Sequence, residues 1–147
     1  MKAALHKRCL ELASEKSDSL EAEMASMRQA AQTESKSTAG DKHETGRAMI
    51  HLEQEKLHQQ LAEAQSVLAE LEQIKLEQNL DTVQKGALVQ TNRATFYIAV
   101  GLGKISIDGK DIFVVSSQSP IGKQMLGKRS GENFSMNGTE YFITSIE

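Results

Sequence analysis

Tryptophan is absent from this sequence, and proline and cysteine each occur once in its 147 residues. A single cysteine excludes a framework of intramolecular disulfides and favours a reducing compartment. No run approaches the roughly 20 apolar residues of a membrane-spanning helix, and the charged start "MKAALHKRCLELASEKSDS" has no signal-peptide core. The net charge of −3 argues against a molecule that binds nucleic acid by its overall charge. These absences predict a soluble, cytoplasmic protein that makes no membrane contact.

Residues 1–80 contain no proline and only two glycines, Gly40 and Gly46. Good helix formers dominate, and apolar residues recur at heptad-like spacing on both sides of a Ser/Thr/Gly-rich stretch. Folding the two seams antiparallel gives a register that also sets Lys16 beside Leu61. It pairs Cys9 with Leu68, Ala13 with Ala64, Leu20 with Leu57, Met27 with Ile50, and Ala31 with Gly46. We therefore expect residues 1–80 to form a coiled-coil hairpin arm roughly 45 Å long, with a bend near residues 38–39 and a tip at about 35–46.

Residues 81–147 show a different pattern, with short β-branched and aromatic segments separated by turn signals. Asp108-Gly109 and Asn137-Gly138 predict two-residue hairpin turns. Between the strands, Ser119 can cap a short helix whose first position is Pro120, with Gly127 near its end. The chain is therefore expected to be α+β: a helical hairpin (1–80) followed by a small antiparallel sheet domain with one short helix (81–147). The expected strand segments are "GALVQTN", "TFYIAVG", "KISIDG", "DIFVVSS", "ENFSMNG" and "TEYFITSI".

Asp41 and Glu44 stand out at the predicted tip, because a turn does not require two acids at this spacing. As a structural feature, Asp41 at the N-cap and Glu44 three residues later would form a capping box that starts the second helix. As a functional feature, the same two carboxylates share one helix face and could supply ligands to Mg²⁺, which prefers carboxylates and phosphates. The sequence leaves both interpretations open.

Other motifs in the chain fall short of known catalytic sites. "HETGR" begins like a zinc protease motif, but Arg47 stands where the second histidine is required. "GKQMLGKR" matches most of a P-loop, but Arg129 stands where Ser or Thr must bind Mg²⁺. Cys9 lies on the predicted seam and is expected to be a buried packing residue. The sequence therefore predicts no active site of its own and no cofactor of its own.

Two stretches together resemble a known family. "SPIGKQMLGKRSGENF" followed by "YFITSI" resembles the C-terminal signature of the bacterial GreA/GreB transcript cleavage factors, and "GDKHE" resembles the Gly-Asp-x-x-Glu tip of that family. The order of hairpin and β-rich domain extends the resemblance over essentially the whole chain.

The resemblance implies a monomeric transcription elongation factor that binds bacterial RNA polymerase, with an FKBP-like second domain and a coiled-coil arm that enters the secondary channel. DNA binding and transcription regulation are the functional classes that go with it. By position, Asp41 and Glu44 would help hold a catalytic Mg²⁺ shared with the polymerase and so stimulate cleavage of backtracked RNA at its 3′ end. Apart from the resemblance, the basic residues Lys42 and Arg47 could contact phosphates of the RNA or simply balance the charge of the two acids. The segment Ser119, Pro120, Ile121, Gly122 and Lys123 would contribute to docking on the polymerase.

The residues after the tip keep two other hypotheses open. The family commonly continues Glu-Asn-Ala-Glu-Tyr, whereas Glu44 is followed here by Thr45, Gly46, Arg47 and Ala48. The same fold could therefore serve a secondary-channel regulator that does not support cleavage. A structural coiled-coil interaction protein, which would form a concentration-dependent dimer, is the third hypothesis.

Overall fold

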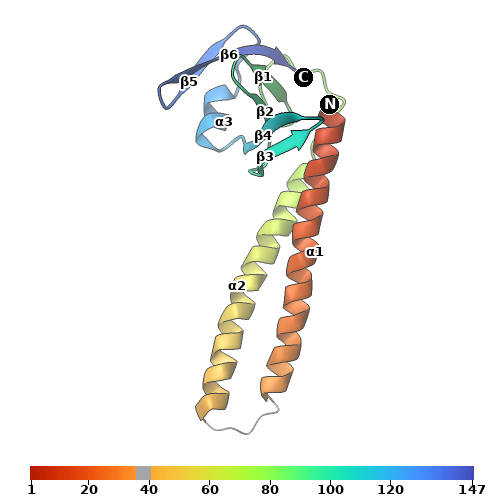
Figure 1. Ribbon diagram of the computed structural model, residues 1–147, viewed down its shortest axis with the longest axis vertical. Helices are drawn as coiled ribbons and strands as arrows, with labels where there is room; N and C mark the ends of the chain where they lie inside the picture. The colour runs from red at the N-terminus through yellow and green to blue at the C-terminus, as the bar shows by residue number, and fades with distance from the viewer. Residues whose placement is uncertain (36–40) are drawn as a thin grey trace. The chain divides into compact units, whose positions relative to one another are not determined.

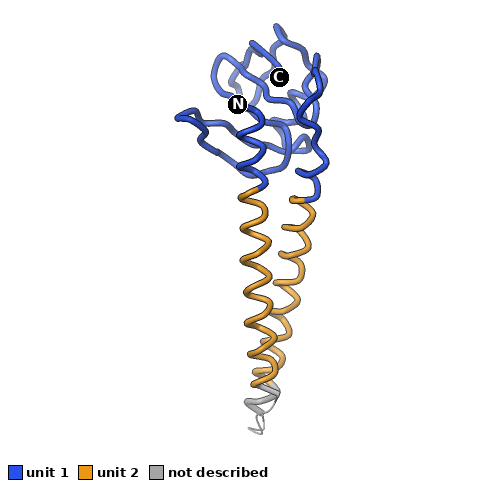
Figure 2. The backbone as a smooth tube through the Cα atoms, turned by 90° about the vertical axis from the view of Figure 1, so that its right-hand side faces the viewer, with its two compact units in different colours: residues 1–10, 69–147 blue, residues 11–68 orange. Residues whose placement is uncertain are grey.

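The computed structural model describes residues 1–35 and 41–147 of the chain, and Figure 1 shows their arrangement. The side chains of residues 34, 35 and 41–44 fall outside that description. Two compact units are present, one made of residues 11–68 and the other of residues 1–10 together with 69–147 (Figure 2). Along the described ranges, none of the helices is long and apolar enough to cross a bilayer.

The first unit is a pair of long helices, α1 (Lys2–Ser35) and α2 (Asp41–Glu72), which lie side by side over residues 11–68. Their apolar cluster consists of Leu20, Met24, Leu57 and Ala64, with Met27 and Leu61 partly buried against it. These residues are those of the predicted seams, so the helical hairpin is confirmed for the described residues. The predicted bend at residues 38–39 lies outside them.

The expected register places Lys16 beside Leu61, with the Lys16 stem along the seam and its ammonium group in water. The side chain of Lys16 is exposed, and that of the neighbouring Ser17 is 6% exposed. The pairing of Lys16 with Leu61 stays a prediction.

The second unit contains a six-stranded sheet with the strand order β3-β4-β2-β1-β6-β5. All six predicted strand segments are present. Their bounds are β1 (Leu88–Thr91), β2 (Thr95–Ala99), β3 (Gly103–Ile107), β4 (Lys110–Ser116), β5 (Asn133–Met136) and β6 (Thr139–Ile146). The α+β class, with a helical hairpin, a sheet and one short helix, is therefore confirmed.

Both predicted hairpin turns are confirmed by their backbone angles. Asp108 and Gly109 have φ values of 51° and 78°, and Asn137 and Gly138 have φ values of 52° and 78°. Positive φ at both central residues defines the turn type whose twist suits adjacent antiparallel strands. Ile107 accordingly lies opposite Lys110 in the β3–β4 pair.

The sheet is not purely antiparallel, which corrects the sequence-based expectation. β2 and β4 pair in parallel, with Thr95 opposite Ile112 and Ala99 opposite Ser116. The chain leaves β2, forms the edge strand β3, and returns through a tight turn, so β4 lies between β3 and β2 and runs in the direction of β2. Local turn signals predict the β3–β4 hairpin but carry no information about which strand the hairpin joins.

Both faces of the sheet are covered within this unit. On one face, α3 (Pro120–Met125) contributes Met125 to a buried cluster with sheet residues such as Phe96 and Ile98. On the same face, ring contacts link Phe113 to Phe96, Phe96 to Tyr141, and Tyr141 to Phe134 across four strands. The other face includes Tyr97, which contacts His6 at the start of α1.

Candidate functional site

The N-terminus of α2 is the first candidate site. Because α2 begins at Asp41, Asp41 and Glu44 are both among the first four residues of the helix. Residues three apart on a helix share a face, so the backbone places the two acids on one side of the helix start. The side chains of Asp41, Lys42 and Glu44 lie outside the described residues, so their capping and metal-binding roles stay predictions.

Arg47, the second residue predicted to contact RNA, lies one helical turn beyond Glu44. Its side chain is exposed, and it borders a small hollow between the two helices together with Ala31, Gln32, Ile50 and His51. The hollow is lined by residues near the end of α1 and near the start of α2. A cation and the two acids therefore belong to the same end of the hairpin.

The short helix α3 is the second candidate site, and hydrogen bonds of Ser119 define its start. The Ser119 hydroxyl accepts a hydrogen bond from the Gly122 N–H (3.1 Å) and donates one to the Ser116 carbonyl (2.6 Å). Pro120 occupies the first turn, where its missing N–H costs nothing. The hydroxyl of Ser119 is therefore engaged in building the helix end, and the predicted cap is confirmed.

Gly122 is buried, and nothing larger fits in its place. A Cβ atom built there would lie 2.1 Å from the Ser116 carbonyl oxygen and 2.9 Å from the Ser119 hydroxyl oxygen. Ile121 is partly buried against the sheet cluster. Of the five predicted docking residues, only Pro120 and Lys123 are therefore exposed, and the other three mainly hold α3 on the sheet.

Two further exposed residues near α3 were missed by sequence reasoning. Leu126, at the C-terminal cap of α3, is 39% exposed, and Phe113 on β4 is 38% exposed. Leu126 follows Lys123 by three residues, and α3 packs against β4. The sequence "DIFVVSS" could have indicated the exposure of Phe113, because it carries apolar residues on both faces of the strand. A helix as short as α3 cannot cover all of these side chains, so one of them stays at the surface. We call Phe113, Pro120, Lys123 and Leu126 the α3 surface.

A third group of polar residues is buried at the start of α1. The ammonium group of Lys2 donates a hydrogen bond to the Glu147 carbonyl (3.0 Å), and His6 Nδ1 lies 2.8 Å from the Tyr97 hydroxyl. Burial lowers the pKa of His6, partly opposed by a hydrogen bond to the Leu71 backbone, and the positive charge of Lys2 lowers it further. The neutral form of the His6 ring is therefore favoured. Through its contacts with Tyr97 and the Leu71 backbone, His6 connects the sheet to the start of α1 and the end of α2.

Cys9 lies fully buried on α1, as predicted. Burial raises the pKa of its thiol to about 11, and burial also raises the pKa of Tyr97. A thiol with this pKa is almost entirely protonated at neutral pH and is a poor nucleophile. Among the side chains that the structure describes, those of residues 1–33 and 45–147, no group of three or more His, Cys, Asp or Glu could hold a metal ion.

Comparisons with known proteins find no matching family model and no matching curated protein. Among solved structures, the chain is similar to the GreA factor homolog 1 (Gfh1) protein of Thermus thermophilus, with 16% identity, 94% of each chain covered and a TM-score of 0.39. It is also similar to a structure of the transcription factor Gfh1, with 14% identity, 94% of this chain and 92% of that chain covered, and a TM-score of 0.39. Any functional assignment therefore depends on the residues and geometry of the chain itself.

Proposed function

We propose that this chain is a Gre-like transcription elongation factor that binds bacterial RNA polymerase and inserts its helical hairpin into the secondary channel. The observation that carries the proposal is the position of Asp41 and Glu44 in the first turn of α2, at the end of a hairpin whose helices contain 34 and 32 residues. At 1.5 Å per residue, each helix is about 50 Å long, which suits a probe that reaches a distant active site. The Ser119-Pro120-Ile121-Gly122 helix start in the same chain supports the family resemblance at a second, independent place.

In this proposal, Asp41 and Glu44 bind Mg²⁺ only in the complex with the polymerase. Two carboxylates on one helix face are an incomplete ligand set for an ion that takes six oxygens, so the polymerase and the RNA phosphates would complete it. When bound, the ion activates water and stabilises the charge that develops on the phosphate. Lys42 and Arg47 would position the RNA through its phosphates. The chain then acts as an accessory factor and not as an enzyme.

The α3 surface is the proposed docking site on the polymerase. It combines two exposed apolar side chains, Phe113 and Leu126, with the exposed cation of Lys123 on α3. A small apolar patch bordered by charge is typical of a transient protein interface. Ser119 and Gly122 contribute indirectly, because they hold α3 in place.

The second hypothesis, a secondary-channel regulator that does not support cleavage, is favoured by one specific feature. Arg47 follows Glu44 by three residues on α2, so the backbone places the two on the same helix face. A cation one helical turn from Glu44 would compete with Mg²⁺ for that carboxylate. Both hypotheses place the hairpin in the same channel and differ only in whether RNA is cleaved.

RNA cleavage in stalled, backtracked elongation complexes tests the proposal at fixed Mg²⁺ concentration. Wild type is compared with Asp41→Asn/Glu44→Gln, which removes two charges while keeping side-chain shape. The matched control is Glu21→Gln/Glu55→Gln, which removes two exposed acids elsewhere on the hairpin. Cleavage that is lost only in the first variant supports the metal-holding role.

Binding of wild type without cleavage would replace the proposal with the regulator hypothesis. The absence of any binding to polymerase would overturn both. A concentration-dependent dimer that is indifferent to the Asp41→Asn/Glu44→Gln change would support a structural coiled-coil protein instead.

A further inference from the structure

A groove runs along one side of the hairpin between α1 and α2. Its volume is about 550 Å³, and all of its lining residues belong to the unit of residues 11–68. The α1 side consists mostly of small side chains spaced three or four residues apart, so they form a track about three turns long. We call it the hairpin groove; it is lined by Ser19, Ala22, Glu23, Ser26, Met27, Ala30, Glu53 and Leu57.

The floor of the hairpin groove is apolar. Leu57 is buried in the hairpin cluster, and Met27 is partly buried against it. Small residues along a helix allow the axis of another helix to approach closely, and helices pack by placing ridges into grooves of this kind. The shape of the hairpin groove is therefore suited to packing against a third helix.

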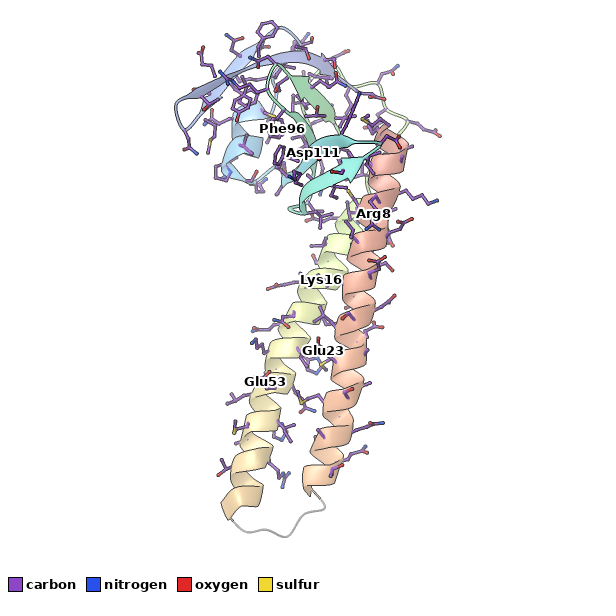
Figure 3. All side chains as sticks on the ribbon, viewed as in Figure 1. Arg8, Lys16, Glu23, Glu53, Phe96 and Asp111 are labelled. Carbon is purple, nitrogen blue, oxygen red and sulfur yellow. The ribbon has the colours of Figure 1, made fainter. Side chains whose placement is uncertain are left out.

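Two acids border the hairpin groove without a partner. Glu23 comes from α1 and Glu53 from α2, and Figure 3 labels both. Both side chains are exposed, and within the described part of the chain neither forms an ion pair or side-chain hydrogen bond. A cation from another molecule can therefore approach either carboxylate without displacing an existing partner.

The apolar surface continues beyond the hairpin groove on α2. Met49 is 63% exposed and Leu52 is 67% exposed, the highest values among the exposed large hydrophobic residues described. Met49 precedes Glu53 by four residues and so lies on the same side of α2. Met49 thus extends the surface that a partner helix could cover.

Charge decides between a second copy of this chain and a different partner. Residues 11–68 contain 11 Asp/Glu and 6 Lys/Arg, a net charge of −5. Two copies facing each other through this side would bring like charges together, which disfavours self-association. A helix with basic residues would instead be attracted.

We propose that the hairpin groove binds a helix of another protein that presents apolar side chains flanked by lysine or arginine. The apolar residues would cover Met27 and Leu57, and the basic residues would pair with Glu23 and Glu53. This inference goes beyond the proposed function, since it holds whether or not the chain acts on backtracked RNA.

The six methionines allow a direct test on the full chain by NMR of ¹³C-labelled methyl groups. The probe is a synthetic 18-residue helical peptide with leucine at every third and fourth position and lysine on the flanks. Its matched control carries glutamate in place of each lysine. We expect the lysine peptide to shift the Met27 methyl signal, whereas the signals of Met125 and Met136 in the sheet unit stay in place.

Variants separate the hairpin groove from the general charge of the hairpin. Glu23→Lys/Glu53→Lys should weaken binding of the lysine peptide at least tenfold. The matched control, Glu21→Lys/Glu55→Lys, changes one exposed acid on each helix outside the lining of the groove, and it should weaken binding about threefold or less.

The inference is overturned by no binding of the lysine peptide, by binding that leaves Met27 unshifted, by equal binding of the two peptides, or by equal effects of the two double variants. A Met27 shift that depends on protein concentration without peptide would also overturn it, since a second copy would then be the occupant.

Discussion

Replacing Gly122 by alanine tests whether α3 is seated as tightly on the sheet as the structure indicates. The added Cβ would lie 2.1 Å from the Ser116 carbonyl oxygen and 3.1 Å from its carbonyl carbon. These are backbone atoms at the end of β4, and the same carbonyl oxygen accepts hydrogen bonds from the Ser119 N–H (3.1 Å) and the Ser119 hydroxyl (2.6 Å). The clash therefore cannot be relieved by rotating a side chain, and α3 must move away from β4.

The change in the free energy of unfolding combines two unfavourable effects and one favourable effect. Adding a methyl group to a packed site costs about 1–3 kcal/mol, and weakening the Ser119 cap adds about 1 kcal/mol. The higher helix propensity of alanine returns about 1 kcal/mol. We expect the free energy of unfolding of the sheet unit to fall by about 2 kcal/mol, which corresponds to a decrease in Tm of roughly 8–16 °C for a domain of this size.

Urea unfolding followed by tyrosine fluorescence measures this change, because both tyrosines, Tyr97 and Tyr141, lie in the sheet unit. The matched control is Gly101→Ala, where a Cβ would meet nothing within 4 Å and where φ is not positive. This control should change stability by less than about 0.5 kcal/mol. If the two variants were equally stable, the inferred contact between α3 and β4 would be refuted.

Four further perturbations test other parts of the structure. Because burial lowers the pKa of His6, the folded state favours the neutral ring. The free energy of unfolding should therefore be highest above the ordinary histidine pKa of 6.5 and should fall as the pH drops below it, with a smaller fall in His6→Gln. Equal urea midpoints at pH 7.5 and 5.5 in wild type would contradict this. Tyr97→Phe removes the hydroxyl 2.8 Å from His6 Nδ1 and should cost about 1–2 kcal/mol in the same unfolding assay, so a loss below about 0.5 kcal/mol would argue against the hydrogen bond. The Cys9 thiol, with its pKa raised from 9.0 to about 11, should react with a disulfide reagent at pH 8 about 100-fold more slowly in the folded than in the unfolded chain, and comparable rates would show that it is accessible. Gly138→Ala should destabilise the β5–β6 hairpin by about 1 kcal/mol because φ is +78° there, and an unchanged Tm would show that the turn has another conformation.

Most of the secondary structure could be predicted because its causes are local. The two Asx-Gly turns, the Ser119-Pro120 helix start and the heptad seams each depend on residues within one or two turns of the chain. The parallel pairing of β2 with β4 could not be predicted, since the strand β3 lies between them in the sequence and ends up at the edge of the sheet. The same limit applies to His6 and Tyr97, whose contact brings together positions 91 residues apart.

The candidate sites divide in the same way. The sequence motifs identify Ser119 and Gly122, and the structure shows why those residue types are needed, namely a cap and a close backbone approach. Phe113, Leu126 and the hairpin groove were not anticipated, because exposure depends on which element covers which face and not on residue type. Asp41 and Glu44 were identified by their spacing and by the resemblance of "GDKHE" to the Gre tip, and their roles stay predictions.

The strand order has a consequence for how the polypeptide is made. β1 pairs on one side with β2, which follows it directly, but on the other side with β6, where Val89 lies opposite Ile146. While the ribosome is still synthesising β6, β1 therefore has an open edge and β5 has no neighbour at all. The helical hairpin is complete long before that point and can form first. The sheet must close late, so a nascent chain stalled before residue 139 would expose buried strand surface and be the species most prone to aggregate.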